Sequence, residues 1–285
     1  MDRKIFLKMT VLGMSGGVMR SSLAQGEPFR IGLTAVILAD QAAFLSRWSD
    51  YLTKRLCTPV TFVVRDSYQA ILDLLFANQL DAAWICGYPY IRHQRQMQLL
   101  AVPLYGGKPL YQSYLIKSRQ RDLVVRGWAD VKGKVLAYSD PLSNSGWLVA
   151  QTQLFTAGLA NRDLKKTFFA HGHRNVAEAV AAQLADVGAI DGYVWDTMRA
   201  QRMAVVDQTE VVWKSELYGF PPLVARATAR HPQTQALQIA LLAMHKEADG
   251  QKLLEALNLT GFEAGTPSLF NSIARMSAAI EARAS

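Results

Sequence analysis

The segment Lys134-Val-Leu-Ala-Tyr-Ser-Asp-Pro-Leu-Ser-Asn-Ser-Gly146 changes character halfway along. Its first five residues are mostly apolar and predict a strand. The residues that follow it, 147–157, predict a helix that Gly158 closes. A turn between a strand and a helix start exposes backbone N–H groups that have no partner inside the helix. Such groups form a binding site for anions.

Residues 140–146 of this segment supply further donors. Ser143, Asn144 and Ser145 have side chains that can donate hydrogen bonds. Gly146 allows a ligand to approach the backbone closely. The turn contains no Lys or Arg, so a bound anion would be held by neutral dipoles. An ordinary serine N-cap also accounts for these residues, and the turn alone does not decide between the two interpretations.

Composition and charge narrow the class of protein. The chain has 285 residues, of which 50% are hydrophobic and 19% are charged, as is typical of a folded globular protein. The length suits one large domain or two lobes of ordinary size. The net charge is +8, and the first 24 residues carry +3 of it. Because the remaining +5 includes no dense Lys/Arg block, we expect no nucleic-acid binding.

Residues 1–24 have the pattern of an export signal. Arg3, Lys4 and Lys8 form a basic start, residues 9–19 are mostly apolar, and Ser22-Leu23-Ala24 is a small-x-small site before Gln25. The apolar stretch is too short to span a bilayer, although an uncleaved anchor is the alternative. We expect cleavage near Ala24–Gln25 and a soluble periplasmic protein.

Two cysteines, Cys57 and Cys86, occur in the chain. Export would permit a disulfide. However, Cys57 ends an expected helix and Cys86 ends an expected strand, which places them at opposite edges of a parallel sheet. We therefore expect two buried free thiols.

The residues after the signal alternate between strand and helix patterns. A helix that Asp40 caps and a helix that begins at Ser67 separate three expected strands, residues 29–33, 60–64 and 82–86. This βαβαβ order predicts a parallel sheet with right-handed crossovers. Ligands bind at the carboxyl ends of the strands of such sheets, where Gly87-Tyr-Pro-Tyr90 lies.

A second alternating unit follows the strand expected at 111–117. Asn175 and Glu178 resemble a capping box within it. The unit is expected to comprise strands at 134–138, 167–169 and 187–194, with helices at 145–157 and 176–185. The remaining elements are expected to be strands at 211–213 and 222–225, and helices at 231–248, 251–257 and 268–284.

Two α/β units in one chain predict two lobes with a cleft between them. Lobe I would comprise residues 25–117 and 215–285, and lobe II would be the insertion at 118–214. The chain would cross between the lobes twice, through two strands that form a hinge, and hinges of this kind close around ligands.

Four segments carry a resemblance to a known family. The turn 140–146 resembles the Asp-Pro-x-Ser-Thr-Ser-Gly turn of the periplasmic phosphonate- and phosphite-binding proteins, the substrate-binding subunits of ABC importers. Ala83-Trp-Ile-Cys-Gly-Tyr-Pro-Tyr-Ile91, Ala185-Asp-Val-Gly-Ala-Ile-Asp-Gly-Tyr-Val-Trp-Asp196 and Pro221-Pro-Leu-Val-Ala-Arg226 are similar to other segments of that family, in the same order. The resemblance covers about residues 29–265. It implies a two-lobed fold of the type 2 periplasmic-binding-protein class, in which each lobe is a mainly parallel sheet flanked by helices.

The resemblance also implies which residues meet the ligand. Ser143, Asn144 and Ser145 would bind an oxyanion, Tyr88 and Tyr90 would reach it from lobe I, and Asp191 would face the other end of the ligand. Two positions depart from the family pattern: Asn144 stands where Thr is usual, and Gly192 stands where a hydroxyl residue is common. Both departures bear on which anion is bound rather than on the class of ligand.

Several of these residues have alternative explanations. Asp191 would repel a fully ionised anion, so it suits a ligand with an amine or with an acidic proton, unless it is a solvated residue at a strand end. Tyr88 and Tyr90 flank Pro89, whose extended geometry would put both rings on one side, but aromatic packing explains them equally well. His173 is either a donor in the cleft or a surface histidine, and His171-Gly-His173 offers too few ligands for a metal site.

The leading functional hypothesis is a binding protein that captures a small phosphorus oxyanion and delivers it to a membrane permease. It would act as a monomer, with no cofactor and no bound metal. The alternatives are a ferric-ion binder that uses Tyr88, Tyr90, His173 and Asp191, and a sensor partner of a membrane kinase. An enzyme is the least favoured class, since Ser145 would need a base and only His173 is near enough to be one.

Overall fold

The structure is a computed structural model, and it describes residues 27–34, 41–120, 122–229 and 232–284. The predicted export signal and the predicted Asp40 cap lie outside these residues. No helix of the described residues is both long and apolar enough to cross a membrane.

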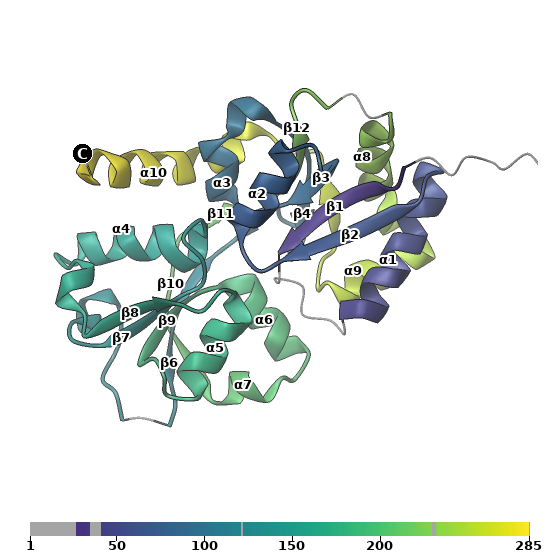
Figure 1. Cartoon of the computed structure of the whole chain (residues 1–285). Coiled ribbons are helices and arrows are strands. Elements are labelled where there is room, and N and C mark those ends of the chain that lie inside the picture. Colours follow the sequence, from purple (N-terminus) through teal and green to yellow (C-terminus); the bar gives the residue numbers. More distant parts are fainter. Residues whose placement is uncertain (1–26, 35–40, 121, 230–231, 285) are drawn as a thin grey trace, which may run out of the picture.

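The strands form two large sheets, each at the centre of one lobe (Figure 1). The sheet of lobe I has the order β13-β4-β12-β3-β1-β2. Its strands are β1 (Phe29–Thr34), β2 (Val60–Arg65), β3 (Ala82–Trp84), β4 (Met97–Leu104), β12 (Leu223–Arg226) and β13 (Gly261–Glu263). The sheet of lobe II has the order β10-β6-β9-β7-β8. Its strands are β6 (Ser113–Ser118), β7 (Val135–Tyr138), β8 (Lys166–Phe169), β9 (Val187–Asp191) and β10 (Thr209–Lys214).

Both sheets are mixed, so the prediction of mainly parallel sheets was only partly right. β1 pairs in parallel with β2 and β3, and β7 pairs in parallel with β8 and β9. The other pairs are antiparallel: β12 with β3 and β4, β13 with β4, and β6 with β9 and β10. The chain passes into lobe II just before β6 and back into lobe I just before β12. Both strands run against the strands of the βαβ units, so they pair in antiparallel fashion.

A small antiparallel pair lies between the lobes. β5 (Leu110–Tyr111) pairs with β11 (Tyr218–Gly219) immediately beside the two crossings. The predicted strand at 111–117 is therefore divided, since β5 ends at Tyr111 and β6 begins at Ser113 in the sheet of lobe II. The predicted lobe boundaries at 117/118 and 214/215 stay a prediction.

Helices cover both sheets. Lobe I carries α1 (Gln41–Leu56), α2 (Tyr68–Phe76), α3 (Gly87–Arg92), α8 (Gln233–Ala243) and α9 (Ala248–Ala256). Lobe II carries α4 (Val149–Thr156), α5 (His173–Ala181), α6 (Gly192–Ala200) and α7 (Ala204–Asp207). The last helix, α10 (Asn271–Ala284), packs against α3 of lobe I and against α4 of lobe II, so it bridges the lobes on one side (Figure 1).

Three local predictions were wrong. Residues 192–194 belong to α6 rather than to a strand, because the Asp191 side chain caps a helix there. Asn175 does not cap α5, which starts at His173 after Gly172; its side-chain amide donates to the Ala170 carbonyl instead. Cys57 is exposed, whereas Cys86 is a buried free thiol as predicted.

Candidate ligand-binding site

The turn 140–146 leads from β7 into a helical start that runs directly into α4. Residues Asn144–Leu148 form a π-helical turn, and the Ser143 hydroxyl accepts the Gly146 N–H at 2.9 Å. The serine N-cap is therefore real. Ser143, Asn144 and Ser145 are all fully buried. A Cβ at position 146 would lie 1.9 Å from Ser139 Oγ, so the glycine is required by the contact with Ser139, whatever room it leaves for a ligand.

The turn faces lobe I. The Asn144 backbone N–H donates to the thiol sulfur of Cys86 at 3.1 Å, and the Asn144 side-chain amide donates to the Tyr111 hydroxyl at 3.0 Å. Asp140 joins the lobes as well, because its carboxylate accepts the Tyr68 N–H at the start of α2 at 3.3 Å. Burial raises the pKa of Asp140, while this amide and that of Leu142 act in the opposite direction. The turn thus lies at the contact between the two lobes.

Three buried polar atoms around the turn have no hydrogen-bond partner among the described residues. They are Ser139 Oγ, Asn144 Oδ1 and Ser145 Oγ. Buried polar groups are nearly always satisfied in folded proteins, so each exception calls for an explanation. The Tyr111 hydroxyl can donate as well as accept. If the Asn144 side-chain amide rotates by half a turn, Oδ1 accepts a hydrogen bond from this hydroxyl and the NH₂ group is left without a partner.

Asp191 ends β9 and caps α6. Its Oδ1 accepts the N–H groups of Tyr193 at 2.9 Å and Val194 at 3.3 Å, and the residue is only 2% exposed. Burial raises the pKa of Asp191 to about 7, because a carboxylate loses its hydration there. The two amides and the nearby Ser145 hydroxyl oppose the rise, whereas the charge of Asp196 adds to it. This carboxyl group therefore exchanges its proton near neutral pH.

His173 starts α5 and contacts the backbone of Asp191. Its Nδ1 accepts the Asp191 backbone N–H at 3.0 Å, so the ring carries its proton on Nε2. Burial lowers the pKa of His173 to about 3. The imidazole is consequently neutral at physiological pH, and its Nε2–H can act as a donor.

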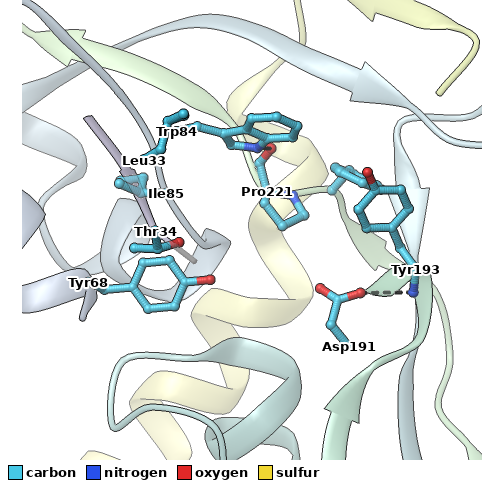
Figure 2. Close-up of a pocket in the computed structure, with 9 residues that line it drawn as sticks. Leu33, Thr34, Tyr68, Trp84, Ile85, Asp191, Tyr193 and Pro221 are labelled. Carbon is cyan, nitrogen blue, oxygen red and sulfur yellow. Dashed lines mark hydrogen bonds between the residues drawn. The ribbon is translucent and has the colours of Figure 1, made fainter. Parts of the chain in front are cut away.

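Two small cavities lie between the lobes, and each leaves about 20 Å³ in which the centre of a water-sized group can lie. Figure 2 shows the first cavity, in which the polar residues are Thr34, Tyr68 and Asp191. The other residues that line it are Leu33, Trp84, Ile85, Tyr193, Phe220 and Pro221. The second cavity shares Thr34 and Tyr68 with the first and is otherwise lined by Asp66, Ser139, Asp140, His171, Gly172 and His173.

The predicted site residues fall into three groups. Asp191 lines the first cavity and His173 the second, while residues 143–146 lie fully buried against lobe I. Tyr88 and Tyr90 line neither cavity. The Tyr88 ring stacks on Trp147 with ring centroids 5.9 Å apart, and the Tyr90 ring packs on Phe270 at 4.8 Å. Pro89 lies in the helix α3, so the extended geometry predicted for this segment is wrong and its two tyrosines pack as core residues.

The structure also shows residues that the sequence analysis missed. Tyr68 reaches both cavities from the first turn of α2, directly after its N-cap Ser67. Tyr111 contacts the turn from β5. The sequence could have indicated Tyr68 as a site residue, because it follows the carboxyl end of β2, where ligands of parallel sheets bind. Gly192, the second departure from the family pattern, is required by packing, since a Cβ there would lie 2.8 Å from the Gln112 carbonyl oxygen.

The ligand set of the ferric-ion alternative is not assembled. His173 and Asp191 line the cavities, but Tyr88 and Tyr90 do not. Within the described parts of the chain, no three His, Cys, Asp or Glu residues form a group that could hold a metal ion.

Comparisons with known proteins agree with this architecture. Residues 34–270 match the family described as periplasmic substrate-binding proteins of ABC transporters for phosphonate. The phosphate-import protein PhnD of Mycolicibacterium smegmatis is 30% identical over 215 residues, which cover 70% of this chain and 66%, just under two thirds, of that protein.

Two solved structures share the fold. The binding-protein component of an ABC phosphonate transporter from Pseudomonas aeruginosa superimposes with a TM-score of 0.80 at 20% identity, over 88% of this chain and 85% of that one. PhnD1 from Prochlorococcus marinus, in complex with methylphosphonate, superimposes with a TM-score of 0.79 at 17% identity, over 89% and 98%. Since the family match spans most of the chain, this protein belongs to the periplasmic substrate-binding proteins of phosphonate ABC transporters.

Proposed function

We propose that this chain captures a small phosphorus oxyanion, of phosphonate, phosphite or phosphate type, between its two lobes and delivers it to the permease of an ABC importer. The family to which it belongs is periplasmic, which agrees with an extracytoplasmic location. The names of its relatives support the class of ligand: one is a phosphate-import protein, and another was solved with methylphosphonate.

One observation carries the proposal. Ser139, Asn144 and Ser145 each keep a buried polar atom without a partner of good geometry. Ser139 lines the second cavity, and the Ser145 hydroxyl is close to Asp191, which lines the first. A ligand that offers several oxygen atoms would satisfy such a cluster. Further neutral donors lie close by, namely His173 through its Nε2–H and Tyr68 through its hydroxyl. Burial raises the pKa of Tyr68 well above its usual value, so this hydroxyl stays protonated.

Asp191 fits a ligand that carries a proton. A fully ionised carboxylate would repel a dianion, but a carboxyl group with a pKa of about 7 can share one proton with an oxygen of the ligand. A hydrogen bond of this kind involves an ionised partner and is stronger than one between neutral groups. We infer that the bound complex holds one proton between Asp191 and the oxyanion.

Ligand entry requires a small rearrangement of the turn. In the structure, the Asn144 N–H donates to the Cys86 sulfur. A thiol sulfur is a weak acceptor, and burial raises the pKa of Cys86 to about 11, so the sulfur carries no charge. An anionic oxygen is the stronger acceptor and would replace the sulfur when the lobes open and close about the β5–β11 hinge.

The remaining parts of the proposal concern the setting of the protein. We propose cleavage of the export signal near Ala24–Gln25, a monomeric protein, and a permease rather than a sensor kinase as partner. We also propose that the site performs no turnover. His173 is the base that Ser145 would need, but its Nδ1 already accepts the Asp191 N–H and its Nε2 is protonated.

A ligand screen by thermal unfolding tests the proposal. Phosphite, methylphosphonate, phosphate and 2-aminoethylphosphonate are added to the purified protein, with nitrate and acetate as control anions. A ligand at 100 times its Kd stabilises the folded state by about 2.7 kcal/mol, so at least one phosphorus oxyanion is expected to raise the Tm clearly. Failure of all four to do so would contradict the proposed function.

A matched pair of variants locates the effect. Tyr68→Phe removes only the hydroxyl that lines both cavities, whereas Tyr51→Phe removes a hydroxyl that donates to Glu247 outside them. We expect the ligand-induced stabilisation to fall only in Tyr68→Phe. An equal response of the two variants to the ligand would place the binding site elsewhere.

A further inference from the structure

We infer that the cleft selects phosphorus oxyanions whose substituent on phosphorus is hydrogen or a methyl-sized apolar group, and that it disfavours both phosphate and aminoalkyl phosphonates. This inference rests on the proposed function and narrows its class of ligand. It follows from the division of the first cavity into a polar side and an apolar side.

The polar side consists of three groups. Figure 2 shows the hydroxyls of Thr34 and Tyr68 and the Asp191 carboxylate oxygen that does not cap α6, all directed toward the same part of the cavity. Asp191 is also close to the Ser145 hydroxyl, which acts on its pKa. Ser145 belongs to the turn that holds the unpartnered polar atoms. The oxygens of the ligand therefore belong on this side.

The apolar side has no free polar side-chain group. Leu33, Ile85 and Phe220 are hydrocarbon, and the Trp84 indole N–H is used by the Pro221 carbonyl at 2.8 Å. The Tyr193 hydroxyl donates to the Leu257 carbonyl, so it points away from Asp191 and Tyr193 presents only its ring to the cavity (Figure 2). A group that points to this side meets only hydrocarbon and aromatic surface.

The cavity is also small. About 20 Å³ is open to the centre of a water-sized group. A hydrogen atom or a methyl group on phosphorus adds least to the volume of the oxyanion, which occupies the polar side of the same cavity. A longer chain would have to displace Leu33, Ile85 or Phe220, each of which is at most 1% exposed.

The two excluded ligands fail for different reasons. Phosphate has a fourth oxygen, which would lose its hydrogen bonds to water on the apolar side without gaining others. An aminoalkyl phosphonate has an ammonium group with three donors. Asp191 is the only carboxylate among the residues that line the first cavity, one of its oxygens already caps α6, and the other faces the oxyanion.

Titration calorimetry on the unmodified protein tests the inference. Phosphite, methylphosphonate, propylphosphonate, 2-aminoethylphosphonate and phosphate are compared at one pH. We expect phosphite or methylphosphonate to bind at least tenfold more tightly than each of the other three. If 2-aminoethylphosphonate or phosphate binds as tightly as methylphosphonate, the inference is overturned while the proposed function stands. If none of the five binds, the proposed function itself fails, and this inference with it.

A variant that enlarges the apolar side adds a second readout. Leu33→Ala removes part of the cavity wall, and Leu72→Ala is a matched control, because Leu72 is equally buried in lobe I but does not line the cavity. We expect the ratio of propylphosphonate to methylphosphonate affinity to rise at least fivefold in Leu33→Ala only. Ile85→Ala serves the same purpose if Leu33→Ala does not fold. An unchanged ratio in the folded cavity variant would contradict the inference.

Discussion

Two strand-to-helix junctions lie side by side in lobe II, and they solve the same structural problem with opposite chemistry. β7 and β9 are parallel neighbours, and a helical segment follows each of them. At the first junction the neutral Ser143 hydroxyl caps the turn, and at the second the Asp191 carboxylate caps α6. The first leaves polar atoms without partners, whereas the second holds a buried acid whose pKa is shifted.

This contrast separates two tasks of one site. Neutral donors can hold an anion at any pH, because they have no charge to lose. A buried carboxyl group instead makes the site sensitive to protons, and it lowers the stability of the empty protein whenever it is ionised. In the site we propose, the junction at β7 would bind the anion, and the junction at β9 would discriminate between protonated and fully ionised ligands.

Replacement of Asp191 by Asn should have the largest effect on stability. The folded-state pKa of Asp191 is about 7, well above that of an unfolded Asp, so the folded state binds more protons between about pH 4 and pH 7. The Asp191 contribution therefore destabilises the fold progressively as the pH rises through this window. Asn keeps the helix cap and removes the charge. We expect Asp191→Asn to raise the free energy of unfolding at pH 8 by roughly 4 kcal/mol.

The pH profile of the same variant supplies the control. His173 has a folded-state pKa of about 3, below its unfolded value of about 6.5, so its contribution to stability grows as the pH rises between these values. In the unmodified protein the two slopes oppose each other between about pH 4 and pH 6.5. Urea unfolding of Asp191→Asn at several pH values should show a slope that is more positive than that of the unmodified protein, because the contribution of His173 is no longer offset by Asp191. A variant that is no more stable than the unmodified protein at pH 8 would contradict a buried, charged Asp191.

Gly146→Ala should have the next largest effect, at the other junction. The added Cβ would lie 1.9 Å from Ser139 Oγ and 2.7 Å from Ser139 Cβ, too close even after rotation of the hydroxyl. Overpacking of this kind typically costs 1–3 kcal/mol, and we expect about 2 kcal/mol by urea unfolding. The double variant Ser139→Gly/Gly146→Ala removes the obstacle and should recover most of the loss. No recovery would show that the glycine is needed for its backbone rather than for this contact.

The two junctions also differ in how well their secondary structure could be predicted from the sequence. The strand, turn and capped helix at residues 134–157 follow from local patterns, and the structure confirms them with a shifted helix start. The strand predicted at 187–194 continued past Asp191, whereas β9 ends at this residue and the helix that it caps was missed. Apolar residues 192–195 continue the pattern of a buried strand, and periodicity alone cannot separate a short buried helix from a strand.

The walls of the first cavity could not be predicted, because they depend on contacts between distant segments. Pro221 and Trp84 are 137 residues apart in the chain. They meet only because β12 pairs antiparallel with β3. Tyr88 and Tyr90 show the opposite error. They lie at the correct strand end, but Pro89 falls within a helix, and packing of α3 turns both rings away from the cavities.

Ser145→Ala should have the smallest effect on stability and should show most directly whether the neutral junction binds the ligand. The Ser145 hydroxyl has no hydrogen-bond partner of good geometry, so its loss should change the free energy of unfolding by less than about 0.5 kcal/mol. Loss of one hydrogen bond to an anion should lower the affinity for the best phosphorus oxyanion about tenfold, measured by titration calorimetry. Ser113→Ala is the matched contrast, since the Ser113 hydroxyl donates to the Ser145 carbonyl at 2.7 Å. The Ser113→Ala variant should lose about 1 kcal/mol of stability and little affinity. If Ser145→Ala instead loses stability but no affinity, the Ser145 hydroxyl serves packing rather than ligand binding.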